Sequence, residues 1–319
     1  MTTSDTTLPW HAAAWREVCA SMNRGRLAHA LLLIGHAGLG KRAFAERLAR
    51  LLLCERPVAT AEGVEPCGHC GACAAMRQRA HPGFRLLQRA ADGTRDIPVD
   101  AVRDACAYLA LTGAAARAKV LVVDRADDLN ANGFNALLKS VEEPSGDAYI
   151  VLTSETSDLL PATLRSRCQT LRFHAPSGSE ALAYLAQAMP ESNERVRLQA
   201  LEETLDAPLL AQRLLSDLPH LERYAQWSEQ LQNLLAGGRA AVEVPSPGVD
   251  RELVADYARH ASVWAWRASR HALATQRSAA ATIRIAHEAD RLARHLHANA
   301  QPRLALDSFM IACGALKAR

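Results

Sequence analysis

Glycines and a lysine near the start of the chain have the spacing that binds the phosphates of a nucleotide. Residues 35–42, with the sequence GHAGLGKR, match the pattern G-x-x-x-x-G-K-[ST] everywhere except at the last position. In that pattern backbone N–H groups and the lysine surround the phosphates, and the final hydroxyl binds Mg²⁺. Arg42 stands at the hydroxyl position and, as a permanent cation with no acceptor, cannot bind Mg²⁺. The residues that keep the pattern are Gly35, Gly38, Gly40 and Lys41.

A second position that nucleotide hydrolysis requires is also altered. The apolar run Val120–Val123 ends in Asp124, where a Walker B strand carries its metal-binding aspartate, but Arg125 replaces the glutamate expected next. A cation cannot accept a proton from the attacking water. Arg42 and Arg125 together argue against ATP hydrolysis at this loop. They leave open whether a nucleotide binds without hydrolysis or whether the loop only connects a strand to a helix.

A group of cysteines predicts a structural metal site. Two overlapping C-x-x-C units, with glycines that suit tight turns, are formed by Cys67, Cys70 and Cys73. Tetrahedral Zn²⁺ needs a fourth ligand. Cys54, separated from Cys67 by twelve residues, is the best candidate, with His69 and His81 as alternatives. Reduced structural thiols or a redox pair are the other interpretations of this spacing, and a structural Zn²⁺ is favoured over both.

The patterns around these motifs predict an α/β domain followed by helices. Short apolar runs at 31–34, 120–123 and 148–152 predict buried strands, and stretches at 43–53 and 132–143 have helical spacing. Such alternation favours a parallel sheet with helices on both faces. After about residue 175 the strand signals stop, and Ser177 with Glu180 predicts the N-terminus of the first of several helices.

Composition limits the class of protein and its surroundings. A chain of 319 residues with 49% hydrophobic residues and a net charge of +3 is typical of a globular protein of two or three domains. The sequence has neither a run of about 18 apolar residues nor the features of a signal peptide. We therefore expect a cytoplasmic protein that does not contact a membrane.

Arginine is unusually frequent, which weakens arguments from single arginines on the surface. Only four of the 37 basic residues are lysine. In the C-terminal half four arginines are spaced by seven, and the last three would share one face if residues 275–297 formed a single helix. A solvated face is favoured over a stripe that contacts DNA phosphates or a partner subunit. These residues are Arg270, Arg277, Arg284 and Arg291.

Several segments together resemble the bacterial clamp-loader subunits of DNA polymerase III, which are AAA+ proteins. They are residues 27–32, the loop 35–42, the four cysteines, residues 135–144 and the triplet 166–168. The resemblance covers about residues 8–175 and is weaker over 176–319. It implies an α/β AAA+ P-loop domain over 1–174 with an inserted zinc knuckle around 54–73. A small helical lid over 175–219 and an all-α collar for oligomerisation over 220–319 would follow.

The resemblance also implies roles for individual residues. Arg167, in the Ser-Arg-Cys triplet, matches the arginine finger that points at ATP bound to the neighbouring gamma subunit. The segment 205–209 has no arginine where an active member carries its lid-borne sensor. The residues that match the family's zinc ligands are Cys54, Cys67, Cys70 and Cys73.

These matches imply a non-hydrolysing stator subunit that is not an enzyme by itself. Its partners would be the gamma/tau and delta subunits of a five-subunit complex in the polymerase III holoenzyme at the replisome. The sliding clamp and primer-template DNA would be reached through that complex. The alternatives are a gamma/tau-type ATPase with an unusual loop and a zinc-containing nucleoside kinase. The kinase is disfavoured because it too needs the missing hydroxyl and base, and because it does not explain the Ser-Arg-Cys triplet.

Overall fold

The computed structural model describes residues 7–90, 96–111, 118–144, 146–158, 160–236, 251–275, 278–297 and 300–315. The chain divides into two compact units, Met1–Ala175 and Pro176–Arg319. Within the described part of the chain, no helix is long and apolar enough to cross a membrane.

The first unit is built on a five-stranded sheet whose paired strands all run parallel. Apolar side chains on both faces of the strands are buried, as expected when helices cover both faces. The strands, in their order across the sheet, are β4(Phe84–Leu87), β5(Lys119–Val123), β6(Ala148–Ser154), β1(Ala30–Ile34) and β7(Gln169–Arg172).

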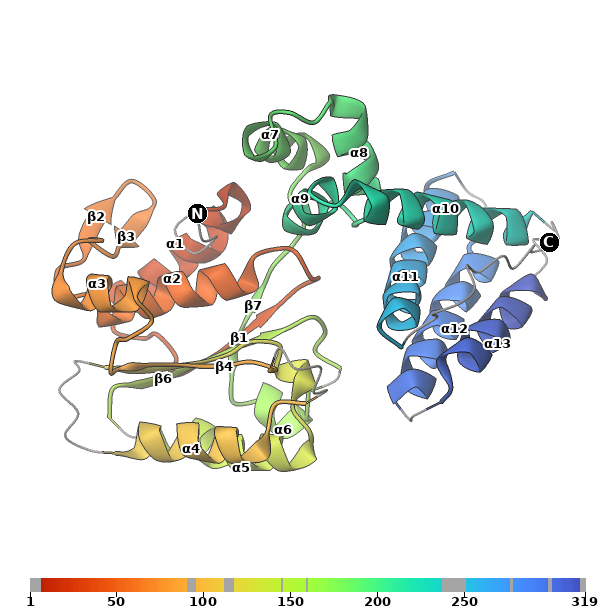
Figure 1. The fold of residues 1–319 in the computed structure, drawn as a ribbon. Helices are drawn as coiled ribbons and strands as arrows, with labels where there is room; N and C mark the ends of the chain where they lie inside the picture. Colours follow the sequence, from red (N-terminus) through yellow and green to blue (C-terminus); the bar gives the residue numbers. More distant parts are fainter. Residues whose placement is uncertain are drawn as a thin grey trace. The chain divides into compact units, whose positions relative to one another are not determined.

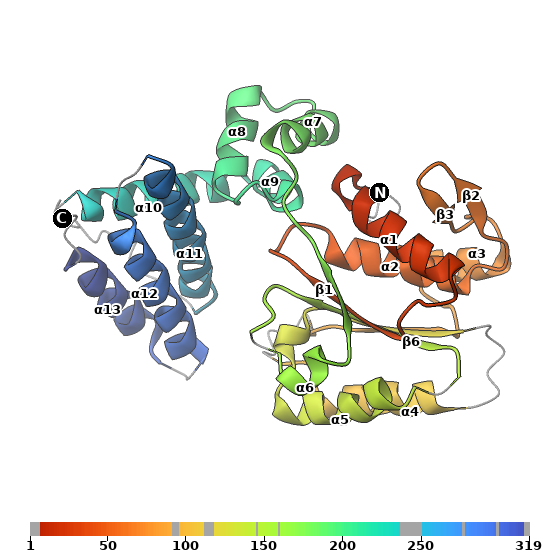
Figure 2. The same cartoon turned by 180° about the vertical axis from the view of Figure 1, so that it is seen from behind.

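Helices lie on both faces of this sheet, which confirms the predicted architecture (Figure 1). One layer contains α1(Ala12–Asn23), α2(Lys41–Leu53) and α3(Gly71–Arg77), and the other contains α4(Val99–Ala110), α5(Ala131–Glu142) and α6(Ala162–Arg165) (Figure 2). The 3₁₀ turns η1(Pro9–His11) and η2(Ala126–Asp128) precede α1 and follow β5. An antiparallel hairpin, β2(Val58–Thr60) and β3(Gly63–Glu65), lies between α2 and α3 in the sequence.

Helix α2 begins where a glycine turns the chain from the loop 35–42. Gly40 has φ of +81°, and a Cβ there would lie 2.3 Å from Leu8 Cδ1. A residue with a side chain would therefore be strained by both its backbone angle and its neighbours. Beyond Gly40 the apolar face of α2 packs Phe44 against Trp15 and Phe173, with ring centroids 5.4 and 5.0 Å apart.

The second unit is entirely helical among its described residues. A first group comprises α7(Gly178–Ala188), α8(Glu194–Glu202) and α9(Pro208–Leu215), and a second comprises α11(Arg251–Ala274), α12(Ala280–His297) and α13(Pro302–Gly314). The helix α10(Leu218–Leu235) belongs to both, because Leu221 lies in the first hydrophobic cluster and Trp227 in the second. The predicted capping interaction is present, since Ser177 and Glu180 hydrogen-bond reciprocally at the start of α7.

A buried polar group joins the two helical groups. The carboxylate of Glu203, just after α8, accepts a hydrogen bond of 2.8 Å from Ser228 Oγ on α10 and lies 3.1 Å from His260 Nε2 on α11. Burial alone would raise the pKa of Glu203, but the interactions with His260, Ser228 and Arg267 lower it. The carboxylate is thus held charged where the two groups of helices meet.

The predicted helix over 275–297 starts too early. Helix α11 ends at Ala274 and α12 begins at Ala280, so Arg270 lies on a different helix from Arg284 and Arg291. Arg277 lies outside the described residues. Arg291 forms an ion pair of 2.6 Å with Glu288 on its own helix.

Candidate functional site: a phosphate-loop remnant, a cysteine cluster and an exposed arginine

The lysine of the phosphate loop is bound to its own loop. Lys41 Nζ donates hydrogen bonds to the carbonyl oxygens of Gly35 and His36, the latter at 2.8 Å. The residue is buried, and burial lowers the pKa of its ammonium group. Gly35 is needed at its position because a Cβ there would lie 2.5 Å from the carbonyl oxygen of Phe173. The loop therefore has a compact form whose cation is already satisfied by protein oxygens.

Arg42 spans the region where a metal ion is bound in an active site of this kind. Its Nε lies 2.9 Å from Glu46 Oε1, and its Nη1 lies 2.6 Å from Gln88 Oε1 and 3.4 Å from Asp124 Oδ2. The other carboxylate oxygen of Asp124 accepts a hydrogen bond of 2.8 Å from Thr153 Oγ1. The predicted Walker B aspartate thus faces a guanidinium group.

Arg125 is also engaged within the protein. Its backbone is left-handed, with φ of +57°, and its N–H donates to Thr153 Oγ1 at 2.8 Å. Its guanidinium group contacts Asp128 at 3.1 Å and Glu155 at 3.0 Å. Two acidic groups are thereby paired with a half-exposed cation of the same chain.

The N-terminal segment covers the end of the loop. Trp10 Nε1 and His11 Nε2 both approach the carbonyl oxygen of Leu39, at 3.0 and 2.7 Å. Burial lowers the pKa of His11 to about 4, so its ring is neutral at pH 7 and can donate its Nε2–H to that carbonyl. Together with Gly40, which contacts Leu8 closely, these bonds fix the turn into α2.

The four cysteines form a cluster that could hold a metal ion. The Sγ atoms of Cys54, Cys67, Cys70 and Cys73 all lie within 4.8 Å of one another. Cys54 follows the last residue of α2, Cys70 caps the N-terminus of α3, and Cys73 lies in the first turn of that helix. Four sulfur ligands at such distances suit tetrahedral Zn²⁺, whose Zn–S bonds are about 2.3 Å.

Backbone N–H groups point at the sulfurs in the way that favours thiolates. The N–H groups of Cys67, Cys70 and Cys73 donate to Cys54, Cys67 and Cys70, at 3.3, 3.4 and 3.4 Å. Burial opposes ionisation of Cys70, but hydrogen bonds from the backbone of Cys73 and Glu55 lower its pKa to about 6. Burial and its sulfur neighbours raise the pKa of Cys73 to about 12. A bound cation would relieve this mismatch by stabilising all four thiolates.

The two histidine alternatives have other partners. His69 is exposed and its Nδ1 contacts the carbonyl oxygen of Cys67 at 2.7 Å, whereas His81 Nδ1 accepts the N–H of Gly83 at 2.9 Å. The cluster that the structure brings together therefore includes Cys54 and neither histidine.

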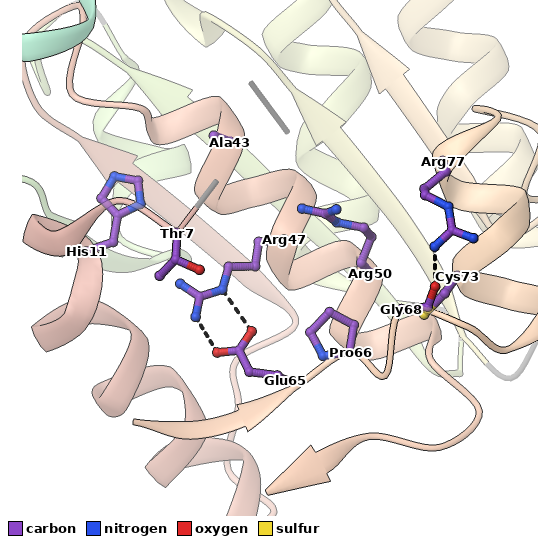
Figure 3. A pocket seen from close by; sticks show the side chains of 10 residues that line it. All are labelled: Thr7, His11, Ala43, Arg47, Arg50, Glu65, Pro66, Gly68, Cys73 and Arg77. Atoms are coloured by element: carbon purple, nitrogen blue, oxygen red, sulfur yellow. Dashed lines mark hydrogen bonds and ion pairs between the residues drawn. The ribbon is translucent and has the colours of Figure 1, made fainter. Parts of the chain in front are cut away.

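A pocket of about 190 Å³ is lined by residues of the N-terminal segment, α2, the hairpin and the cysteine cluster. Figure 3 shows Arg47 paired with Glu65 and Arg77 reaching the carbonyl oxygen of Gly68. Arg47 is only 7% exposed, forms a bidentate pair with Glu65, and stacks 3.8 Å from the ring centroid of Trp15. These contacts attach the hairpin to α1 and α2 and so hold the cysteine module on the sheet domain.

Arg167 is exposed and lies apart from the phosphate loop in the sequence. It follows α6 and lies at the end of the sheet domain, with 41% of its side chain accessible to solvent. Its Nε lies 2.8 Å from Glu142 Oε1, and its Nη1 donates to the carbonyl oxygen of Thr163 at 2.9 Å. Arg167 lies in the same domain as the loop, and its side chain contacts Glu142 of α5 and Thr163 of α6.

Comparison with known proteins decides the family. A family model described as "DNA polymerase III, delta subunit" matches residues 10–177. The subunit delta' of DNA polymerase III from Pseudomonas aeruginosa is 39% identical over 210 residues, which cover 65% of this chain and 60% of that protein. This chain belongs to the delta' family of DNA polymerase III.

Other members of the polymerase are similar as well. The tau subunit of Salmonella typhimurium is 33% identical over 153 residues, which cover 48% of this chain and 22% of that protein. A crystal structure of a gamma subunit-related protein from Thermotoga maritima covers 96% of this chain and 99% of its own, at 16% identity and a TM-score of 0.46. The chain spans about 60% of the length of the Pseudomonas aeruginosa delta' relative, and the family model matches the sheet domain.

Three residues that contact the arginines described above carry no recognisable local signal in the sequence. Glu142 and Glu65, the partners of Arg167 and Arg47, were not singled out, because nothing in their local pattern shows which cation they meet. Gln88, which binds Arg42, follows β4, a strand that the apolar runs did not reveal.

Proposed function

We propose that this chain is the stator of the polymerase III clamp loader and does not hydrolyse ATP itself. The supporting observation is that both substituted arginines, Arg42 and Arg125, are paired with acidic side chains at the loop. Hydrolysis requires a metal ion at that position and a general base beside it. A rigid, catalytically silent subunit would give the ring a fixed end.

The second part of the proposal concerns the neighbouring ATP site. Arg167 would act in trans as an arginine finger on ATP bound by a gamma/tau-type subunit, where a guanidinium stabilises the charge that develops during phosphoryl transfer. Its exposure and its position outside the chain's own loop support this role. Delta would be the other protein partner, with the sliding clamp and primer-template DNA bound through the complex in the cytoplasm. The cysteine cluster would hold a structural Zn²⁺.

Replacement of Arg167 tests this function. In a clamp loader reconstituted with gamma/tau and delta, Arg167→Ala should leave assembly intact and lower DNA-stimulated ATP turnover. In well-studied cases an arginine finger contributes about 10³–10⁵-fold to the site that it serves. Unchanged turnover by an assembled mutant complex would remove the finger role.

The retained lysine and glycines favour one alternative, a gamma-type ATPase. Hydrolysis by the isolated chain that Lys41→Ala abolishes would support it. A stator of the proposed kind is expected to have no such activity.

A further inference from the structure

The exposed arginine of the Ser-Arg-Cys triplet is held by contacts through two of its three guanidinium nitrogens. Arg167 uses Nε to contact Glu142 Oε1 at 2.8 Å and Nη1 to donate to the carbonyl oxygen of Thr163 at 2.9 Å. The remaining nitrogen, Nη2, takes part in neither contact. A guanidinium carries five N–H donors in a fixed plane, so contacts through Nε and Nη1 orient the group and leave donors of Nη2 able to meet another anion.

The two backbones that carry this pair are firmly placed. Glu142 is the last residue of α5, where His29 Nε2 contacts the neighbouring carbonyl oxygen of Val141 at 2.6 Å. Arg167 follows α6, and Leu164 of that helix is fully buried in the same hydrophobic cluster as Val141. The carboxylate therefore presents a fixed acceptor to a side chain that would otherwise sample many rotamers.

We propose that Glu142 is a positioning residue for Arg167, holding its guanidinium ready for a phosphate bound by the neighbouring subunit. This inference rests on the proposed finger role. The carboxylate does not touch ATP. It orders the arginine before the phosphoryl group reaches its transition state, so less ordering remains to be done during the reaction.

The pair is well suited to positioning and poorly suited to stabilising the fold. The side chains of Glu142 and Arg167 are 44% and 41% exposed, and ion pairs at that exposure contribute little to folding. A variant of Glu142 should therefore fold and assemble normally, which separates its effect on turnover from any effect on stability.

The chain provides a matched control one residue away. Glu143 is exposed and acidic like Glu142, and its backbone caps the end of α5. Glu143→Ala changes the charge near the finger by the same amount without removing the contact at 2.8 Å. A glutamine at 142 supplies the second control, because its amide oxygen can accept the hydrogen bond from Nε.

The experiment is steady-state ATP turnover by the reconstituted complex with DNA, comparing four single variants at positions 142, 143 and 167 and one double variant. Relative to the native complex, Glu142→Ala should lower kcat about two- to fivefold, the equilibrium factor that corresponds to an exposed ion pair, with KM for ATP unchanged. Glu142→Gln should restore most of kcat, and Glu143→Ala should have no effect. Arg167→Ala should lower kcat more than Glu142→Ala, and Glu142→Ala should cause no further loss in the Arg167→Ala background.

The outcomes separate this inference from the finger role. If Arg167→Ala does not change turnover, the finger role fails and the positioning role fails with it. If Arg167→Ala lowers kcat but Glu142→Ala does not, only the positioning role is overturned. It is overturned equally if Glu143→Ala lowers kcat as much as Glu142→Ala, or if Glu142→Ala still lowers kcat when Arg167 is absent.

Discussion

Arg42 places its Nη1 atom 3.4 Å from Asp124 Oδ2, in the region where an active phosphate loop and its Walker B aspartate share a metal ion. The residues are 82 positions apart and belong to α2 and the end of β5. A guanidinium group here adds a fixed positive charge without the open coordination positions of Mg²⁺. The pair therefore places one positive charge beside the aspartate and offers no coordination position of its own.

We predict that restoring a hydroxyl at position 42 alone does not make the isolated chain an ATPase. Arg42→Thr restores the missing hydroxyl, but Arg125 still stands where a general base is required. Turnover of the isolated chain should stay at background, both for Arg42→Thr and for the native protein, when measured by phosphate release at saturating ATP and Mg²⁺. Lys41→Ala is the control for contaminating activity. Turnover by Arg42→Thr that Lys41→Ala eliminates would mean that the hydroxyl was the one missing element.

The cysteine cluster should bind one metal ion per chain. Replacing any one ligand, for example Cys54→Ser, should lower zinc affinity by several orders of magnitude, because a tetrahedral structural site depends on all four thiolates. Metal content by elemental analysis and affinity by competition with a chromogenic chelator provide the measurement. Cys106→Ser is the matched control, since Cys106 lies outside the cluster and contacts the carbonyl oxygen of Ala136.

The identity of the fourth metal ligand can be tested directly. His69→Ala should keep the metal, because His69 is exposed and lies outside the cluster. A chain that keeps its zinc after Cys54→Ser but loses it after His69→Ala would contradict the arrangement of ligands described above.

Local sequence patterns predicted the elements of the sheet domain but not the side-chain contacts of Arg42 and Arg125. Apolar runs and glycines are local signals, so they located β1, α2, β5 and β6 to within a few residues. The pairing of Arg42 with Asp124 depends on the order of the strands, which brings β4 and β5 together beside α2. The short strand β4 was missed because its sequence, FRLL, carries an exposed arginine in only four residues.

The contacts of Arg167 show the same difference between local sequence signals and contacts that depend on the fold. Arg167 was recognised because it belongs to a contiguous triplet, whereas Glu142 could be paired with it only after α5 and α6 were placed side by side. The cysteines form an intermediate case. Cys67, Cys70 and Cys73 are fixed by local spacing, but Cys54 joins them because α2 ends beside α3.

The ion pair between Arg47 and Glu65 should stabilise the attachment of the cysteine module. Glu65→Gln leaves a guanidinium that is nearly buried without its charged partner, which should lower the free energy of unfolding by about 1–3 kcal/mol. Urea unfolding measures the loss, and limited proteolysis should show faster cleavage within residues 55–80. Asp100→Asn breaks the exposed pair with Arg103 and should cost about 0.5 kcal/mol or less. Equal losses in the free energy of unfolding for Glu65→Gln and Asp100→Asn would contradict a stabilising role of the buried pair.

The buried ring of His11 should make stability fall between about pH 6.5 and pH 4. Its pKa in the folded chain is about 4, whereas the unfolded chain has the ordinary value of 6.5. Below pH 6.5 the unfolded state therefore binds a proton that the folded state does not, and acidification favours unfolding. The shift corresponds to about 3 kcal/mol, fully lost once the pH is below 4. Above pH 6.5 this group makes no pH-dependent contribution.

His11→Gln isolates that contribution, because the amide can still donate a hydrogen bond to Leu39 but does not titrate. Urea unfolding followed from pH 7.5 to pH 4 should give a shallower pH dependence for His11→Gln than for the native chain, although the variant is less stable at pH 7. The exposed His174 provides the control, and His174→Gln should reproduce the native slope. If the native chain and His11→Gln lose stability in parallel over this range, His11 is not buried as a neutral ring, and the contact between the N-terminal segment and the loop must be looser than its 2.7 Å hydrogen bond indicates.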